Sequence, residues 1–190
     1  MKKIIAPGIC LRALEAGDAE QFAAVVLESV PTVGRWMSWC HAGFTVDGAH
    51  EWFDACNRAR AESTAYEFGI FTEDGKELLG GCGLNLISKM HNYCNLGYWV
   101  RQSKQGQGIA TQVARILAEA GFRHMGFNRI EIVVAEGNEL SMQVARKLGA
   151  QHECMARNRL MVDGQPVSAS INSLILQEWP ALACPMTIES

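Results

Sequence analysis

Gln105-Gly106-Gln107-Gly108-Ile109-Ala110 is the stretch that decides the fold. It follows the apolar run 96–100, which predicts a buried strand, and apolar side chains then recur at helical spacing from Ile109 to Ala120. A strand therefore leads through a turn with two glycines into a helix. The first N–H groups of that helix lack intrahelical acceptors, and the helix macrodipole adds partial positive charge beside them. The turn is thus predicted to bind phosphate oxygens.

The two glycines of this turn sharpen the prediction. Gly106 and Gly108 lack Cβ atoms, so ligand oxygens can approach the backbone closely and the turn can adopt positive φ. An ordinary strand-to-helix turn would also use glycine. A dinucleotide-binding fingerprint fits less well because Thr111 stands where a third glycine is needed, and the absence of Gly-Lys-Ser/Thr excludes a P-loop.

Two motifs carry a resemblance to a known superfamily. The turn resembles the Gln/Arg-x-x-Gly-x-Gly/Ala signature of GNAT acetyltransferases, which holds the pyrophosphate of acetyl-coenzyme A (acetyl-CoA). Residues 138–149 resemble that superfamily's second element, Asn-x-x-Ser-x-x-x-x-x-Lys-x-Gly. Together with Leu96-Gly97-Tyr98-Trp99, the pattern is similar to the RimJ/RimL branch, the N-terminal acetyltransferases of ribosomal proteins. The resemblance extends from about Leu11 to Trp179.

Composition limits the class of protein. With 190 residues and 48% hydrophobic content, the chain is long enough for one core and short for two, so we expect a single domain over residues 1–190. A net charge of −3 offers no basic field for nucleic acid, and no stretch approaches the roughly 18 apolar residues of a membrane span. Seven irregularly spaced cysteines indicate reduced thiols, and the histidines form no metal-binding pair. We expect a cytoplasmic protein without metal, nucleic-acid or membrane partners.

The strand and helix signals predict an α/β (α+β) fold with a mixed sheet. Asp18 and Asp47 are the expected N-caps of the first two helices, Trp52 should face the core, and glycines at 80–83 indicate a bulge. The sheet should have about seven strands, mostly antiparallel and twisted, with helices on both faces. The GNAT resemblance implies that strand 95–100 splays from its parallel neighbour 129–135. Strands are predicted at 9–14, 65–71, 78–87, 95–100, 129–135, 153–162 and 167–176, and helices at 18–29, 47–61, 108–124 and 138–148.

Two tryptophans occupy a segment of poor periodicity between the first two helices. Trp36 and Trp39 either fill the core or form a substrate-facing wall, since large amphipathic rings suit recognition loops. The RimL resemblance implies that this segment belongs to the acceptor cleft.

The resemblance also implies the roles of the motif residues. The pantetheine arm would lie between the splayed strands, and a backbone N–H near Trp99 or Val100 would polarise the thioester carbonyl. Ser141 would deliver a proton to the departing thiolate, although Ser141 and Asn138 could both serve only as helix caps. The predicted cofactor-binding residues are Tyr98, Trp99, Val100, Gln105, Gly106, Gln107, Gly108, Ile109, Ala110, Thr111 and Asn138.

No general base is evident from the motifs. RimL-like sequences tend to carry glutamate where this chain has Asn95 and Arg159. At pH 7, deprotonating an α-amine costs about 1.2 kcal/mol, whereas deprotonating lysine costs about 4.6 kcal/mol. The missing base therefore favours an α-amine or another weakly basic acceptor. The conceivable replacements are Glu67, Glu153, His91 and His152.

The resulting prediction is an acetyl-CoA-dependent N-acetyltransferase that acts on the N-terminal amine of a ribosomal protein. One alternative keeps the chemistry and changes the acceptor to a small amine, such as an aminoacyl nucleotide, an antibiotic or a polyamine. Another is a CoA-binding regulatory module without turnover. The RimL resemblance suggests a homodimer.

Overall fold

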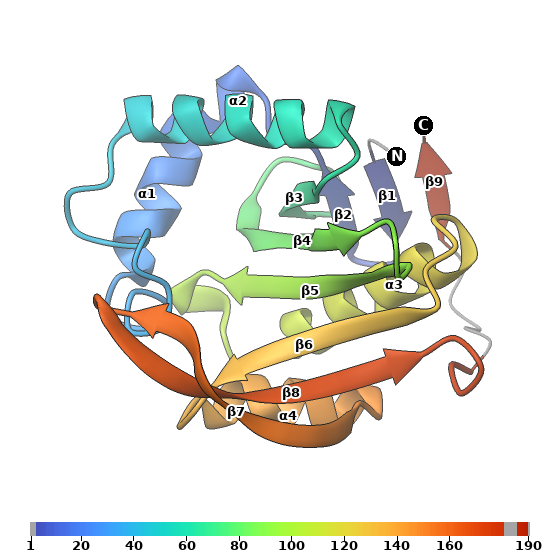
Figure 1. The fold of residues 1–190 in the computed structure, drawn as a ribbon. Helices are drawn as coiled ribbons and strands as arrows, with labels where there is room; N and C mark the ends of the chain where they lie inside the picture. Colours follow the sequence, from blue (N-terminus) through green and yellow to red (C-terminus); the bar gives the residue numbers. More distant parts are fainter. Residues whose placement is uncertain (1–2, 181–185, 190) are drawn as a thin grey trace.

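A computed structural model describes residues 3–180 and 186–189, and its strands form one mixed sheet in the order β7-β8-β6-β5-β4-β3-β2-β1-β9 (Figure 1). The pair β5–β6 is parallel, and the other described pairs are antiparallel. The strands are β1 (Lys3–Ala6), β2 (Ile9–Arg12), β3 (Tyr66–Thr72), β4 (Leu78–Ser88), β5 (Tyr93–Val100), β6 (Arg129–Ala135), β7 (Gln151–Val162), β8 (Gln165–Ile175) and β9 (Thr187–Glu189). The helices are α1 (Ala19–Ser29), α2 (Val46–Ala61), α3 (Ile109–Arg123) and α4 (Glu139–Leu148), with short 3-10 turns η1 (Ala16–Asp18) and η2 (Gln102–Lys104).

The mixed sheet confirms the predicted fold class, but the described residues form nine strands where about seven were expected. The two additional strands, β1 and β9, pair with each other at the edge of the sheet. They contain four and three residues, so they are too short to reveal the two-residue alternation on which strand prediction depends.

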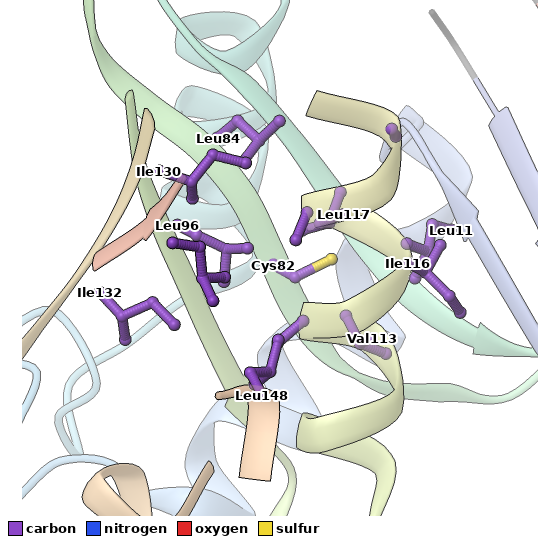
Figure 2. Packing of buried hydrophobic residues seen from close by; sticks show 14 of the residues in the cluster. Leu11, Cys82, Leu84, Leu96, Val113, Ile116, Leu117, Ile130, Ile132 and Leu148 are labelled. Carbon is purple, nitrogen blue, oxygen red and sulfur yellow. The ribbon is translucent and has the colours of Figure 1, made fainter. Parts of the chain in front are cut away.

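Helices cover both faces of the sheet, as predicted, and each pair of helices encloses its own core (Figure 1). Phe22 of α1 and Phe53 of α2 pack with Phe71 on one face. On the other face, Leu117 of α3 is fully buried and packs with Leu96 of β5 (Figure 2). Within the described residues, no helix is both long and apolar enough to cross a membrane.

Strands β5 and β6 separate after a short parallel contact. Their paired residues end at Asn95 and Glu131. Beyond this point β5 continues along β4 as far as Val100, and β6 continues along β8 as far as Ala135. The predicted splay is confirmed, and it leaves a gap between two strand edges that are not paired with each other.

Three local predictions are corrected by the structure. Asp18 is the N-cap residue of α1, as predicted, but its carboxylate makes no capping hydrogen bond and accepts instead from Arg12 and from the Glu15 N–H. Thr45, rather than Asp47, caps α2, because its Oγ1 accepts from the Gly48 N–H at 3.0 Å. The third is Trp52, which is 45% exposed because the buried stripe of α2 consists of Ala49, Phe53 and Cys56.

The glycines of β4 produce the predicted bulge. The register of β3 against β4 shifts between Ile70, which faces Gly80, and Phe71, which faces Leu78. Gly80 also allows a close approach, since a Cβ there would lie 2.1 Å from the carbonyl oxygen of Trp99. The described cysteines are free thiols, five of them buried and Cys154 exposed, while Cys184 lies outside the described residues.

Candidate active site

The turn between β5 and α3 presents its backbone to open space. Gly106 and Gly108 have φ of +76° and +83°, and a Cβ on either would meet no atom within 4 Å. Gly108 is the N-cap of α3, and its carbonyl oxygen accepts the first helical hydrogen bond from Gln112 at 3.1 Å. Among the described residues, the N–H groups of 109–111 have no acceptor. The turn therefore presents backbone donors to open space at the start of α3.

Gln105 contributes to this turn as a brace. Its Nε2 donates to the Val100 carbonyl oxygen at 2.9 Å and to Thr32 Oγ1 at 3.1 Å. The amide group of the side chain thereby ties the turn to the end of β5 and to the segment after α1. The backbone of the turn, rather than this amide, faces the open side.

The carboxylate of Glu28 on α1 binds the residues that lead into this turn. Arg101 Nε donates to Glu28 Oε2 at 3.1 Å, and the Ser103 N–H donates to Oε1 at 2.8 Å. These bonds, that of Arg101 foremost, lower the pKa of Glu28 to about 2. Lys104 lies 3.0 Å from Glu77 Oε1. Because both cations are paired with carboxylates, the backbone N–H groups remain the main source of positive potential at the turn.

The antiparallel ladder decides which backbone groups of β5 face the gap. The Arg101 N–H donates to the Leu79 carbonyl oxygen at 2.9 Å, so these two residues form a hydrogen-bonded pair. Such pairs alternate along antiparallel strands, and Trp99 is therefore bonded to β4, whereas Tyr98 and Val100 direct their N–H groups away from it. The Trp99 N–H is therefore not free to polarise a thioester carbonyl, and the N–H groups of the two neighbouring residues, Tyr98 and Val100, face away from β4.

Helix α4 contacts β5 in the part of β5 that is no longer paired with β6. Asn138 is its N-cap, and Asn138 Oδ1 accepts from the Ser141 N–H at 3.2 Å. Tyr98 Oη lies 3.0 Å from Ser141 Oγ and donates to the Ser141 carbonyl oxygen at 3.2 Å. Burial raises the pKa of Tyr98 to about 12, so its phenol stays protonated at neutral pH. The structure thus brings the motif serine beside a second hydroxyl that the sequence analysis had not paired with it.

Trp36 and Trp39 lie beside Gly137 and Trp99, and neither side chain is fully buried. The Trp39 ring centroid lies 5.3 Å from that of Trp99 on β5, and the side chain is 39% exposed. Trp36 is partly buried, and its Cη2 would lie 3.8 Å from a Cβ built on Gly137, the residue before Asn138. The core-filling alternative is wrong for Trp39, and the substrate-facing wall stays a prediction.

The conceivable base residues fall into different environments. Glu153 is held by Arg129 at 2.6 and 2.7 Å and by Ser173 at 2.7 Å, and these bonds lower its pKa to about 2. His91 lies in the turn before β5, at the end where β5 is still paired with β6. His152 is exposed on β7 and lies beside Ser170. Glu67 of β3 is the one of the four that is linked by side-chain hydrogen bonds to Asn95. Within the described residues, no group of three or more His, Cys, Asp or Glu side chains has the geometry of a metal site.

Comparison with known proteins supplies the family. The model of a GNAT acetyltransferase domain matches residues 9–151. The chain is a GNAT acetyltransferase. This acetyltransferase is similar to YdaF of Bacillus subtilis, which carries a provisional name as a ribosomal N-acetyltransferase, with 30% identity over 172 residues, 90% of this chain and 93% of YdaF.

The named homologues are RimJ/RimL-like, as predicted, and a solved structure shares the fold. It is 27% identical to the [ribosomal protein uS5]-alanine N-acetyltransferase of Escherichia coli over 124 residues, 65% of this chain and 64% of that enzyme. Its fold is similar to that of Mycobacterium smegmatis RimJ in complex with a CoA disulfide, with a TM-score of 0.84 and 22% identity, covering 94% of this chain and 88% of RimJ.

Proposed function

We propose that this acetyltransferase binds acetyl-CoA at residues 105–111 and in the gap between β5 and β6, and that it acetylates the N-terminal α-amine of a ribosomal protein in the cytoplasm. The observation that carries the proposal is the separation of β5 from β6 after Asn95, with the α3 N-terminus and Ser141 at the same end of the gap. The continuous sheet supports a single-domain enzyme.

The α3 N-terminus would hold the diphosphate. The free N–H groups of residues 109–111 and the open space above Gly106 and Gly108 fit phosphate oxygens, which are the ligands this part of a helix attracts. A hydrogen bond to a charged group contributes about 1.5–3 kcal/mol. Asn138, whose side chain already caps α4, would help to form the wall of the site rather than contact the diphosphate.

Acetyl-CoA, when bound, would supply an acetyl thioester whose cleavage releases a thiolate. The N–H of Tyr98 or Val100 would donate to the thioester carbonyl oxygen, a contribution that requires no particular side chain. The amine nitrogen would bond to the thioester carbon as the C–S bond breaks. Ser141 Oγ would give its proton to the leaving sulfur and regain the proton that the acetylated nitrogen releases, and the neutral phenol of Tyr98, 3.0 Å away, would hold Ser141 in position.

The acceptor is proposed from the chemistry of the base and from the relatives. Glu153 is bound in an ion pair, so it cannot take a proton from a lysine ammonium at low cost. An α-amine loses its proton to water at a cost of about 1.2 kcal/mol at pH 7. Two relatives are named as N-acetyltransferases of ribosomal proteins, one acting on an alanine of uS5. Trp36 and Trp39 would border the acceptor.

A thiol-release assay with peptide acceptors tests this function. Peptides with a free N-terminal alanine or serine should release CoA, and mass spectrometry should place the acetyl group on the α-amine. The same peptides with a blocked N-terminus and an internal lysine serve as the control. Acetylation of lysine alone, or no thiol release with any free amine, would contradict the proposal.

A further inference from the structure

Three side chains form a hydrogen-bonded chain across β3, β4 and β5. Glu67 Oε1 accepts from Asn85 Nδ2 at 2.9 Å, and Asn85 Oδ1 accepts from Asn95 Nδ2 at 2.9 Å. Asn95 Oδ1 is buried and has no partner among the described residues. This series of side chains therefore has a direction, because each donor points towards Glu67 and the unpartnered acceptor is Asn95 Oδ1.

The unpartnered end of this hydrogen-bonded series lies where β5 separates from β6, because Asn95 is the last β5 residue in that pairing. Side chains alternate along a strand, so Asn95 shares a face with Trp99, which packs against Phe22 of α1. Tyr98 points to the opposite face and reaches Ser141. A group bound at Asn95 and a sulfur beside Ser141 would thus approach the gap from opposite faces.

The backbone of β4 is shaped around the carboxyl group of Glu67. A Cβ on Gly83 would lie 2.0 Å from Glu67 Oε2, so glycine is required opposite this side chain. Burial raises the pKa of Glu67, while the hydrogen bond from Asn85 and the nearby Arg60 act in the other direction. Gly97 leaves room beside Asn85, because a Cβ there would come no closer than 3.8 Å to Asn85 Nδ2.

We propose that Asn95 Oδ1 accepts a hydrogen bond from the amine that is to be acetylated, and that Glu67, acting through Asn85, is a positioning residue for this contact. Aligned hydrogen bonds polarise one another, so a carboxylate at one end makes the oxygen at the other end a better acceptor. An oxygen of this kind favours a cationic or N–H-rich donor such as an ammonium group. The inference rests on the proposed function and specifies how the site selects amines.

The neighbouring carboxylates do not fill this role. Glu131 faces Asn95 across the parallel pair, but its Oε1 accepts from Arg129 Nε at 3.0 Å. Glu153 is bound to the same arginine. Glu67 is the carboxylate that is connected, through Asn85, to the unpartnered oxygen of Asn95.

Four variants test the inference. Glu67→Gln keeps an oxygen for Asn85 and removes the charge, and Asn95→Asp places a carboxylate at the open end. The double variant E67Q/N95D combines them, and Glu62→Gln, at the exposed C-cap of α2, is a control with the same change of charge. Circular dichroism and thermal unfolding show whether each variant is folded.

Steady-state kinetics with an alanine-initiated peptide gives the first readout. Glu67→Gln should raise the KM for the peptide about tenfold, the difference between a charge-supported and a neutral hydrogen bond. The KM for acetyl-CoA should stay within about twofold, and E67Q/N95D should recover most of the peptide KM. Equal KM values in Glu67→Gln and Glu62→Gln, a parallel rise in both KM values of Glu67→Gln, or no recovery in the double variant would overturn the proposal.

A binding measurement separates this inference from the proposed function. Calorimetry on the CoA-loaded protein compares a free-amine peptide with the same peptide N-acetylated, and it needs no turnover. The wild-type protein should prefer the free amine about tenfold, and Glu67→Gln should lose most of that preference. A wild-type protein that binds free-amine peptide selectively but releases no thiol would contradict only the proposed function, whereas equal binding of both peptides would overturn the role of Asn95.

Discussion

Replacing Gly108 by alanine tests the turn that begins α3. Gly108 has φ of +83°, a conformation that costs a residue with a Cβ roughly 1–2 kcal/mol. A Cβ there would meet no protein atom within 4 Å, so the substitution adds conformational strain without a clash. The strain can be relieved only if the turn changes its backbone angles, and this would reorient the N–H groups of residues 109–111.

The expected loss of CoA affinity depends on how many of the N–H groups of residues 109–111 lose their hydrogen bonds to the diphosphate. Losing one hydrogen bond to a phosphate oxygen costs about 1.5–3 kcal/mol, which corresponds to a loss of about 10- to 150-fold in affinity. Titration calorimetry with CoA should show this loss for Gly108→Ala. Pantetheine lacks the diphosphate, so its affinity should be nearly unchanged.

Gly164 provides a matched control for this substitution. It has φ of +73° in the turn between β7 and β8, and a Cβ there would also meet no atom within 4 Å. Gly164→Ala should therefore lose a similar amount of stability in urea denaturation while binding CoA like the wild-type protein. The reasoning is refuted if Gly108→Ala binds CoA normally, or if both variants lose affinity equally.

Three further predictions concern the proton donor, the core and the buried carboxyl group. Ser141→Ala should lower kcat by about 10²–10⁴-fold with little change in the KM for acetyl-CoA, and an unchanged kcat in a thiol-release assay would exclude Ser141 as the proton donor. Leu117→Ala should lower the free energy of unfolding by about 2–5 kcal/mol in urea denaturation because Leu117 is fully buried; a loss below about 1 kcal/mol would contradict the packing. Glu67 has a raised pKa in the folded chain, so the folded state holds its proton more tightly than the unfolded state, and stability should fall as pH rises from about 4.5 through the folded pKa. Glu67→Gln should lack this part of the pH dependence when its free energy of unfolding is measured in urea at pH 5 and pH 8. The neighbouring groups Cys56 and Arg60 remain in the variant. The same change in stability between the two pH values in the wild-type protein and in the variant would contradict this prediction.

Local patterns were sufficient for most of the elements. The helical spacing after Ile109 and the glycine at 149 define α3 and the end of α4, because both are properties of neighbouring residues. The caps were less certain: Thr45 and Asp47 lie two residues apart, and both are good capping residues. Burial, which decides the orientation of Trp52, depends on what α2 packs against.

The site depends on contacts that no local pattern contains. Tyr98 and Ser141 are 43 residues apart, and their hydroxyl groups meet only because β5 diverges from β6 beside α4. The same applies to Gln105, whose amide reaches Thr32 across 73 residues. The hydrogen-bonded series from Glu67 to Asn95 depends on the registers of three strands, so the sequence alone did not pair Glu67 with Gly83.

A crystal structure of the protein with bound CoA is the most direct test of the central claim. The diphosphate oxygens should lie within about 3.2 Å of the backbone nitrogens of residues 109–111, and the sulfur should lie in the gap between β5 and β6 beside Ser141 Oγ. A diphosphate bound away from the α3 N-terminus, or a sulfur outside this gap, would contradict the account.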